Sequence, residues 1–416
     1  MPLLILHNAR LLDVANRAVV EGASIAIEGG LIREVSAQPI RARNARRLDI
    51  GGRSVLPGLI DAHCHVTISD GNLRNLAGVP LTLSTARAGM VLRGMLDRGF
   101  TTVRDTAGAD WGLKQALDEG SLIGPRLFIS GRPLTQTGGH GDQRLRTEHG
   151  LACACSGLGL MMQVADGVEN VQRAAREELR QGVDQIKIML SGGVISPYDP
   201  LDSVQYTRAE LEAVVDEARR WGRHVTAHAY SAAAIQHAVA AGVRGIEHGN
   251  LIDDASAHAL ARAQGYMVPT LVAYESLLQH GKSMGLTAVQ LDKARVVRDQ
   301  GLNSLAVAAS AGVTLGFGTD LLGDQHPMQS LEFSIRAQVQ PAWDVLRSAT
   351  VENAEILNMT GKLGVIAAGA FADLIVIEGD PLKDLGLLQE QGRHMPLIMQ
   401  GGKLHKMGLR PGKATW

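Results

Sequence analysis

Two histidines separated by one residue are the first feature of this chain that could do chemistry. His63 and His65 belong to the segment Asp61-Ala62-His63-Cys64-His65. Residues two apart in a β-strand project to the same face, so both imidazoles can bind one metal ion. Two packed or solvated histidines are the alternative explanation of such a pair. The apolar run Leu56–Ile60 precedes the pair, which favours a position at the end of a buried strand.

Further side chains that can bind metal ions follow apolar runs later in the chain. They are Lys187, His228, His248 and Asp320. Each alone has an ordinary explanation, such as a core histidine, a lysine that extends to solvent or an aspartate that caps a helix. Together they favour a shared site, because barrel enzymes hold their catalytic groups at the carboxyl ends of the strands.

Lys187 needs a chemical change before it can bind a cation. A protonated ammonium would be repelled by a metal ion, and a free amine offers a single donor atom. Carboxylation by carbon dioxide would give an anionic carbamate with two oxygens. That group could bridge two metal ions held about 3.5–4 Å apart. We therefore expect Lys187 to be carboxylated and to lie between two divalent ions.

Short apolar runs that alternate with longer amphipathic segments would position these groups. The runs expected as strands are Gly58–Asp61, Thr101–Arg104, Arg126–Ser130, Gln185–Leu190, His224–His228, Gly245–His248, Met267–Leu271 and Thr314–Gly318. Helices are expected most clearly over Asp166–Gln181 and over Thr207–Trp221, which opens with the capping-box pattern of Thr207 and Glu210. Eight such repeats predict an α/β fold, namely a (β/α)8 TIM barrel over residues 58–362.

Strand patterns also occupy both ends of the chain. Ala18–Ile27 and Leu31–Ser36 flank the turn Glu28-Gly29-Gly30, and similar patterns return at Phe371–Ile377 and Leu397–Leu404. We expect residues 1–57 and 363–416 to form one small discontinuous β-sandwich beside the barrel.

Composition excludes several classes of protein. The net charge of −1 provides no field that would attract a polyanion, and 3% aromatic residues leave few stacking platforms, so nucleic acid is not an expected partner. No apolar run is long enough to span a bilayer. The chain shows no signal-peptide pattern at its start, and its three cysteines suit a reducing compartment, so a cytoplasmic location is expected. Cys64 should pack away from its histidine neighbours, and Cys153 with Cys155 are too few for a second metal site.

The ordered set of HxH, Lys187, His228, His248 and Asp320 resembles that of the dinuclear amidohydrolase superfamily. The branch that looks most similar contains imidazolonepropionase-like proteins and Xaa-Pro dipeptidases, which also carry a Thr-Gly-Gly-His-Gly stretch, here Thr137–Gly141. Ochratoxin-hydrolysing amidohydrolases are similar too. The tail Gly364–Leu374 resembles the return of that superfamily to its β-sandwich. The resemblance covers nearly the whole chain.

The resemblance implies a ligand set for two metal ions. His63, His65 and Asp320 would hold the more buried ion, His228 and His248 the outer one, and carboxylated Lys187 both. Zinc is the first expectation, although these ligand types also accept manganese and cobalt. A bridging lysine is typical of amide or ester hydrolysis rather than of deamination.

Several residues are expected to act on the substrate. The two ions would lower the pKa of a bridging water, and the resulting hydroxide would attack the carbonyl while Asp320 carries the proton to the leaving nitrogen. His140, in the glycine-rich loop, could donate to the carbonyl oxygen, and Tyr230 could bind the substrate carboxylate or the oxyanion. Solvent contact and core packing are the alternatives for these two residues. Ser191 and Gly192 could bind substrate through backbone donors.

The expected function is hydrolysis of a small amide. The resemblance favours a dipeptide or an N-acyl amino acid with a free carboxylate, ochratoxin-type amides included. A hydrolase of cyclic amides, similar to imidazolonepropionase, is the enzymatic alternative, and a metal-binding scaffold without turnover is the other. Related proteins form oligomers, so a homo-oligomer is expected.

Overall fold

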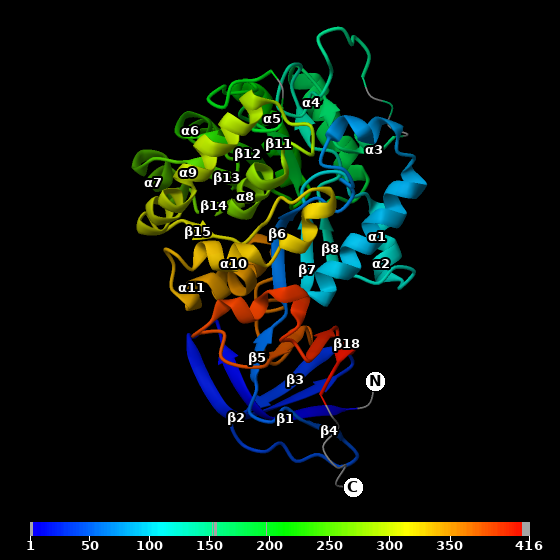
Figure 1. Ribbon diagram of the computed structural model, residues 1–416, viewed down its shortest axis with the longest axis vertical. Coiled ribbons are helices and arrows are strands. Elements are labelled where there is room, and N and C mark those ends of the chain that lie inside the picture. Colours follow the sequence, from blue (N-terminus) through cyan, green and yellow to red (C-terminus); the bar gives the residue numbers. More distant parts are fainter. Residues whose placement is uncertain (1–2, 152, 154–155, 197, 410–416) are drawn as a thin grey trace. The chain divides into compact units, whose positions relative to one another are not determined.

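The computed structural model describes residues 3–151, 153, 156–196 and 198–409 and shows an α/β protein (Figure 1). The chain divides into two compact units. Unit 1 consists of Met1–Asp61, Leu92–Val103 and Phe333–Trp416, and unit 2 consists of Ala62–Val91 and Arg104–Glu332. Each unit therefore combines segments that are far apart in the sequence.

One mixed sheet in unit 1 takes strands from both ends of the chain. The hydrogen-bonded order is β18-β17-β16-β5-β1-β2-β3, and β4 pairs with β1. The strands are β1 (Leu4–Asp13), β2 (Ala18–Glu28), β3 (Leu31–Ser36), β4 (Arg46–Asp49), β5 (Ser54–Pro57), β16 (Leu374–Ile377), β17 (Leu397–Gln400) and β18 (Lys403–Met407). Val55 of β5 pairs with Val376 of β16, and both belong to one buried apolar cluster. Strands from the two ends thus share a sheet and a core.

Glycine pairs make the tight turns of this sheet. Gly29 and Gly30 adopt φ angles of 61° and 87° between β2 and β3, as the turn expected there requires. Gly401 and Gly402 adopt φ angles of 54° and 74°. The strand pattern expected over Leu397–Leu404 is therefore divided into a hairpin of β17 and β18.

Two further sheets contain the strands expected between the chain ends. The three-stranded sheet has the order β6-β7-β8, and the seven-stranded sheet has the order β10-β9-β11-β12-β13-β14-β15. Their bounds are β6 (Leu59–Cys64), β7 (Phe100–Asp105), β8 (Arg126–Ile129), β9 (Leu134–Thr135), β10 (Gln163–Val164), β11 (Ile186–Met189), β12 (Val225–Ser231), β13 (Gly245–Leu251), β14 (Tyr266–Val268) and β15 (Thr314–Leu315). Each of the eight expected runs overlaps one of these strands. The short strands β9 and β10 were not expected, and the paired strands from β9 to β15 run parallel to each other.

Backbone hydrogen bonds in unit 2 also link these two sheets. The N–H of Ala62 in β6 donates to the carbonyl of Phe317, just after β15, at 2.8 Å. The N–H of Asp184, just before β11, donates to the carbonyl of Ile129 in β8, also at 2.8 Å. A Cβ on Gly318 would lie 2.6 Å from that of His63, so glycine is required for this close approach. Among the described residues, no strand ladder closes the two sheets into a single ring.

Helices connect the strands. Their bounds are η1 (Leu73–Gly78), α1 (Leu81–Asp97), α2 (Trp111–Asp118), α3 (Gly157–Leu160), α4 (Val168–Arg180), α5 (Arg208–Arg220), α6 (Ala232–Ala240), α7 (Asp254–Arg262), α8 (Leu271–His280), α9 (Ala288–Ser310), η2 (Gly323–Met328), α10 (Leu331–Arg336), α11 (Ala342–Arg347), η3 (Ser348–Glu352), α12 (Asn353–Ile356), η4 (Leu385–Leu388) and η5 (Glu390–Gly392). The two clearest helix predictions are confirmed as α4 and α5. The side chains of Thr207 and Glu210 form the expected capping box of α5.

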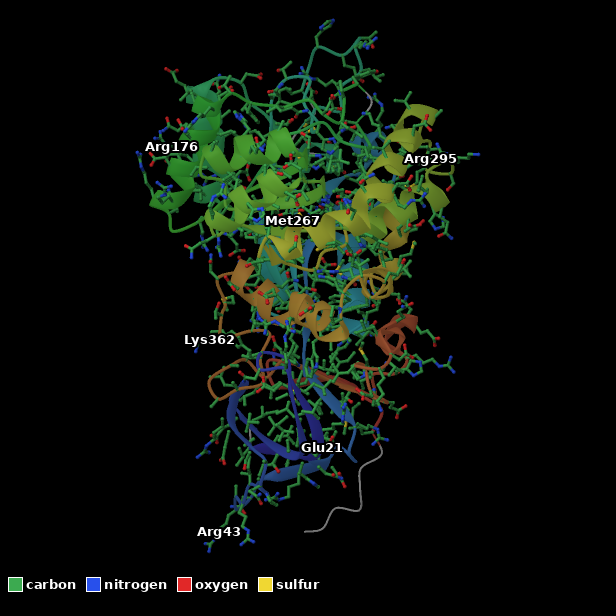
Figure 2. All side chains as sticks on the ribbon, turned by 90° about the vertical axis from the view of Figure 1, so that its left-hand side faces the viewer. Glu21, Arg43, Arg176, Met267, Arg295 and Lys362 are labelled. Carbon is green, nitrogen blue, oxygen red and sulfur yellow. The ribbon has the colours of Figure 1, made fainter. Side chains whose placement is uncertain are left out.

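In unit 2, charged residues of the amphipathic helices are exposed and apolar residues of the strands are buried. Figure 2 shows Arg176 of α4 and Arg295 of α9 at the surface, whereas Met267 of β14 lies inside and is completely buried. Helix α6 packs on β12 and β13, and helix α9 packs on β13. Within the described part of the chain, every helix is too short or too polar to cross a bilayer.

Candidate metal centre and active site

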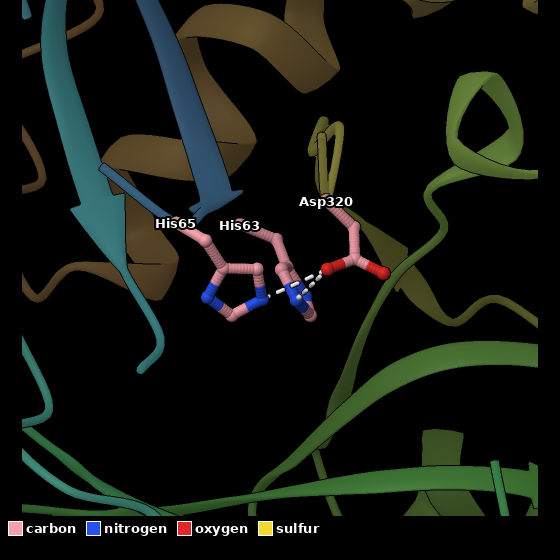
Figure 3. A group of neighbouring side chains, drawn as sticks. All are labelled: His63, His65 and Asp320. Carbon is pink, nitrogen blue, oxygen red and sulfur yellow. Dashed lines mark ion pairs between the residues drawn. The ribbon is translucent and has the colours of Figure 1, made fainter. Parts of the chain in front are cut away.

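His63, His65 and Asp320 form one tight cluster (Figure 3). Nε2 of His65 lies 2.8 Å from Oδ1 of Asp320, and Nε2 of His63 lies 3.4 Å from the same oxygen. One ligand atom from each residue lies within 4.8 Å of the other two. Two imidazole nitrogens and a carboxylate oxygen at this spacing are a suitable donor set for a divalent ion.

The backbone brings Asp320 to the two histidines. His63 lies in β6, and its carbonyl accepts hydrogen bonds from the N–H groups of Thr319 and Asp320, both at 2.9 Å. Asp320 adopts a φ of 52°, which is uncommon for a residue other than glycine. Such a conformation persists only where the surrounding structure enforces it, and it is frequent at functional sites. His248 is a second example, with a φ of 74°.

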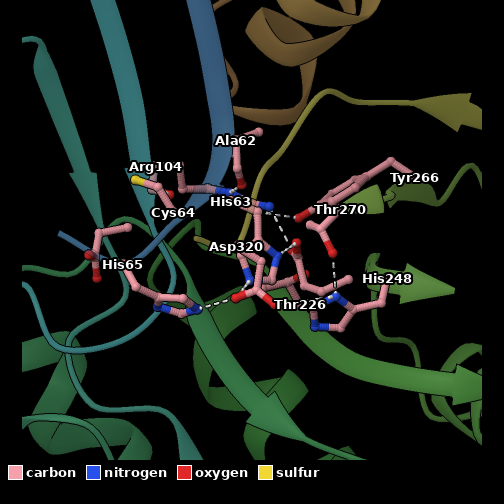
Figure 4. A network of polar contacts seen from close by, with 12 residues as sticks. Ala62, His63, Cys64, His65, Arg104, Thr226, His248, Tyr266, Thr270 and Asp320 are labelled. Carbon is pink, nitrogen blue, oxygen red and sulfur yellow. Dashed lines mark hydrogen bonds and ion pairs between the residues drawn. The ribbon is translucent and has the colours of Figure 1, made fainter. Parts of the chain in front are cut away.

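A buried ion pair orients His63, which Figure 4 labels together with Arg104. Oε2 of Glu247 lies 2.7 Å from Nδ1 of His63, and Arg104 Nη2 donates to Oε1 of Glu247 at 2.6 Å. Both charged side chains are completely buried. Burial alone would raise the pKa of Glu247, but Arg104 and His63 lower it well below its usual range. Glu247 is therefore an anion that accepts the Nδ1 hydrogen, which leaves Nε2 of His63 for a metal ion.

Lys187 of β11 lines the same pocket, with 2% of its surface exposed. Burial lowers the pKa of Lys187 to about 8, although Glu247 and Asp320 oppose this shift. Among the described residues, no carboxylate forms an ion pair with its Nζ. A lysine with a lowered pKa more often carries a free amine, which is the form that reacts with carbon dioxide.

His228 and His248 bring two more imidazoles to the pocket. Their ring centroids lie 4.6 Å apart, and the ring of His248 lies 4.9 Å from that of His63. Nδ1 of His248 lies 2.8 Å from Oγ1 of Thr270, so Nε2 is left for a ligand. Nε2 of His228 lies 3.3 Å from the carbonyl oxygen of Gly192.

His140 and Tyr230 lie beside these histidines. The ring of His140 stacks on that of His228, with centroids 4.2 Å apart, and the ring of Tyr230 stacks on that of His248 at 5.1 Å. The Tyr230 hydroxyl accepts a hydrogen bond from the Tyr274 hydroxyl at 3.0 Å. Burial raises the pKa of Tyr230, so its hydroxyl keeps a hydrogen to donate. Both His140 and Tyr230 line the pocket.

The backbone donors expected at Ser191 and Gly192 already have protein acceptors. The N–H of Ser191 donates to the carbonyl of His228 at 3.2 Å, and that of Gly192 donates to the carbonyl of Ser203 at 3.3 Å. Neither residue is among those that line the pocket. The structure thus gives no support to substrate binding through these two N–H groups.

The pocket in unit 2 has two chemically different sides. We call the first the polar side: it consists of the six expected metal ligands together with His140 and Tyr230. We call the second the apolar wall: it consists of Ile68, Leu73, Met161, Met162, Ile195, Leu277 and Leu322. Lys187 is the single lysine or arginine among the described lining residues. The apolar wall therefore suits an uncharged, apolar part of a ligand.

Sequence reasoning missed residues that hold the polar side in place. Glu247, Arg104, Thr270 and Tyr274 each contact an expected ligand or a neighbour of one. Two of them carried a usable signal: Glu247 and Arg104 are charged residues inside runs expected to be buried strands, where a charge needs a partner. The sequence alone does not show that these two residues pair, because it does not show which strands lie next to each other.

The cysteines supply no ligand to this site among the described residues. Cys64 is buried and forms no disulfide, and its Sγ donates to the carbonyl of Arg104 at 3.4 Å, in agreement with its expected packing role. Cys153 is disulfide-bonded rather than a thiol, which differs from the expectation of reduced cysteines. Cys155 lies outside the described residues.

Comparisons with known proteins place this geometry in a family. The model of the amidohydrolase family matches residues 54–402. Ochratoxinase of Aspergillus niger is 29% identical over 374 residues, which cover 87% of this chain and 77% of the relative.

Two solved structures are similar over almost the whole chain. An amidohydrolase superposes with a TM-score of 0.95 at 47% identity, covering 98% of this chain and 100% of the other. A prolidase complexed with N-methylphosphonate-L-proline also reaches a TM-score of 0.95, at 46% identity, with 97% and 100% covered. The residues matched by the family model include all six expected ligands. The protein is therefore a hydrolytic enzyme that acts on C–N bonds, and it belongs to the amidohydrolase family.

Proposed function

We propose that this enzyme is a dinuclear metal-dependent hydrolase that cleaves the amide of a dipeptide or an N-acyl amino acid with an apolar acyl portion. The observation that carries the proposal is the convergence of His63, His65, Lys187, His228, His248 and Asp320 on one pocket. Six such side chains in one pocket that also has an apolar wall suit a reaction centre that must bind an amide beside metal ions.

The donor set fits two divalent ions. His63 and His65 present Nε2 atoms to Asp320, and the second nitrogen of His63 is already bonded to Glu247. These three residues would hold one ion, and His228 with His248 would hold the other. Zinc is our first choice of metal. When bound, divalent ions provide a nucleophile at neutral pH and polarise the scissile carbonyl.

Lys187 would bridge the two ions as a carbamate. The support is its burial and its place in the pocket without an ion-pair partner among the described carboxylates. An unmodified ammonium there would face metal ions of like charge, whereas carboxylation replaces that charge by an anion with two donor oxygens.

Asp320 would move the proton in the reaction. Its Oδ1 faces Nε2 of His63 and Nε2 of His65, whereas its Oδ2 lies 3.9 Å from Nδ1 of His248. One oxygen can thus bind a metal ion while the other accepts a proton and passes it to the leaving nitrogen. His140 and Tyr230 would donate hydrogen bonds to the substrate carbonyl or carboxylate.

The substrate class follows from the apolar wall and from relatives. The similar prolidase structure is a complex with N-methylphosphonate-L-proline, and another relative is an ochratoxinase. In this chain the wall offers no charged partner among its described residues, so an apolar acyl group or N-terminal side chain fits it best.

We also propose that β6–β8 and β11–β15 close into a (β/α)8 barrel. The support is the hydrogen bonds from Ala62 to Phe317 and from Asp184 to Ile129, which lie at the two junctions between the sheets. For the strands of unit 1, we propose the small β-sandwich expected from the sequence.

A substrate screen tests the proposed function. Enzyme reconstituted with zinc and bicarbonate would be assayed against N-acyl amino acids, dipeptides and cyclic amides. We expect hydrolysis of linear substrates with apolar acyl groups, loss of activity after chelation, and recovery with added zinc. Activity on cyclic amides alone would contradict the proposal, and so would linear-amide hydrolysis that survives complete metal removal.

A further inference from the structure

Gln143 is a polar residue of the pocket to which the proposed reaction gives no role. It lines the pocket, and 8% of its surface is exposed. Its Nε2 donates to the carbonyl of His140 at 2.9 Å, and its own carbonyl accepts from Nη1 of Arg74 at 3.1 Å. Gln143 is thus bonded to His140 of the polar side and to η1, which carries Leu73 of the apolar wall.

The bond to His140 determines how the side-chain amide of Gln143 is oriented. A backbone carbonyl can only accept, so the NH2 group of the amide must face it, and Oε1 must point elsewhere. Among the described residues, no donor bonds Oε1 of Gln143. A nearly buried acceptor without a donor costs free energy unless a ligand satisfies it. Oε1 is therefore available to a donor on a bound substrate.

Gln143 also lies where two cavities of unit 2 meet. Together with Met162, it lines both the pocket of the expected metal ligands and a second cavity. The second cavity has further apolar lining at Ala77, Leu151 and Leu158. The acyl portion of a substrate can therefore continue past Gln143 into the second cavity.

Charge decides which kind of donor suits this free amide oxygen. Asp320 is the single aspartate or glutamate among the described residues that line the first pocket, and it is an expected metal ligand. The carboxylates that line the second cavity are already paired, Asp142 with Arg144 at 2.6 Å and Glu148 with Arg74 at 2.9 Å. A buried ammonium would lack an anionic partner and would face metal ions of like charge. An uncharged N–H carries neither cost.

Gln325 is the competing candidate for such a role. It lines the first pocket with 8% of its surface exposed, and its Nε2 donates to Sδ of Met284 at 2.7 Å. Its Oε1 has no donor among the described residues either. However, Gln325 is not among the described residues that line the second cavity. An N–H bound by Gln143, at the junction of the two cavities, leaves room for a group on each side of it.

We propose that Gln143 is a specificity-determining residue that accepts a hydrogen bond from an uncharged N–H in the acyl portion of the substrate. The preferred substrates are then N-acylated dipeptides, in which the N–H of the first residue reaches Gln143 and the N-acyl group enters the second cavity. A free dipeptide presents an ammonium at this position and is a poorer substrate. This inference rests on the proposed amide hydrolysis and narrows its substrate class.

Two acyl groups that differ at one position test the inference. They are N-acetylglycyl and 4-oxopentanoyl, in which CH2 replaces the N–H, and both are joined to the amino acid that the substrate screen selects. Zinc-loaded enzyme is assayed for release of that amino acid. Because one neutral hydrogen bond is lost, kcat/KM should be about tenfold lower for the 4-oxopentanoyl compound. The corresponding glycyl dipeptide should also have a lower kcat/KM than the N-acetylglycyl compound.

Variants separate recognition from folding. Gln143→Met keeps a similar side-chain length without an acceptor, so the ratio of the two kcat/KM values should approach one. A loss of activity that is equal for both compounds, with the ratio unchanged, would mean that Gln143 has only a structural role. Gln300→Met, the same change at an exposed position of α9, should keep the wild-type ratio. If Gln325→Met abolishes the ratio and Gln143→Met does not, Gln325 binds the N–H and the role of Gln143 is refuted.

The inference and the proposed function can fail separately. If wild type hydrolyses linear amides but treats the two compounds equally, the proposed function stands and the inference about Gln143 is wrong. If wild type hydrolyses no amide, the proposed function fails, and calorimetry with the two phenylalanine conjugates then tests Gln143 by binding alone. Weaker binding of the 4-oxopentanoyl compound to wild type, with the difference lost in Gln143→Met, would support the acceptor role, and equal binding to wild type would overturn it.

Discussion

The two sides of the pocket are held in place by different means. On the polar side, backbone hydrogen bonds from Thr319 and Asp320 to His63, and the buried pair of Glu247 and Arg104, hold His63 and Asp320 in place. The apolar wall comes largely from connecting segments, such as Leu73 in η1 and Ile195 between β11 and α5. Groups that carry out the reaction need fixed geometry, whereas apolar contacts depend on area and tolerate small shifts. We therefore expect substitutions on the polar side to change metal binding and turnover, and substitutions on the apolar wall to change substrate binding.

The largest effect is expected on the polar side from Asp320→Asn. An amide keeps an oxygen for a metal ion but cannot accept the proton, so kcat should fall about 10²- to 10⁴-fold. Metal analysis and steady-state kinetics check this, with metal content expected to stay largely unchanged. A variant that retains wild-type turnover would remove Asp320 from the proton pathway.

The next effect is expected from Lys187→Ala. Loss of the bridging group should reduce metal content and lower activity about 100-fold, in the range found when groups that support a metal site are removed. A short carboxylic acid can occupy the vacated space and offer two oxygens, so added acetate or propionate should restore part of both. Unchanged metal content and activity would refute the bridging role.

Glu247→Gln tests the buried ion pair that contacts the expected ligand His63. The amide retains the shape but loses the charge that pairs with Arg104 and with Nδ1 of His63, so metal affinity should fall about 10- to 100-fold. The unpaired Arg104 should also destabilise the fold by about 3–5 kcal/mol. Metal titration and denaturant unfolding measure the two effects. Equal metal affinity in wild type and variant would show that Glu247 does not orient His63.

On the apolar wall, Leu73→Ala should change binding rather than chemistry. Loss of apolar contact is expected to raise KM about tenfold for substrates with a large apolar acyl group, with kcat almost unchanged. Substrates with an acetyl group should show little difference. Val289→Ala, at an exposed position of α9, is the matched control. A fall in kcat for Leu73→Ala, with KM unaltered, would contradict the distinction between the two sides.

The smallest effect is expected far from the pocket. Arg180 and Glu177 form an exposed ion pair on α4, and such pairs contribute little to stability because water and salt screen the two charges. Arg180→Ala should leave KM and kcat at wild-type values and shift the unfolding midpoint only slightly. A marked loss of activity would mean that the pocket is sensitive to changes throughout unit 2, and the comparison of its two sides would lose its meaning.

The strands and the ligands of the polar side could be predicted because both leave local patterns. An HxH pair after an apolar run, or Asp320 after Thr314–Gly318, is visible within a few residues of sequence. All eight expected strands overlap observed ones for the same reason. Between β6 and β15, the short strands β9 and β10 were not predicted, because two residues are too few to show a periodic pattern.

The supporting residues could not be predicted because their partners are distant in sequence. Arg104 and Glu247 meet only when the strands have assembled in register. The N–H groups of Ser191 and Gly192 were expected to bind substrate, but they donate to the carbonyls of His228 and Ser203. The sequence does not reveal these two acceptors. Likewise, Lys293 is an ordinary helical lysine until its three carbonyl partners are known.

The pairing of β5 with β16 has a consequence for synthesis of the chain. Val55 and Val376 are neighbours in the sheet but are made several hundred residues apart. While the ribosome produces the intervening segment, one edge of β5 has no partner strand, and its apolar Val55 and Leu56 are open to pairing with other chains. The nascent protein should therefore be most prone to aggregate before β16 emerges from the ribosome. Pairing of β16 with β5 should then cover this edge and reduce aggregation.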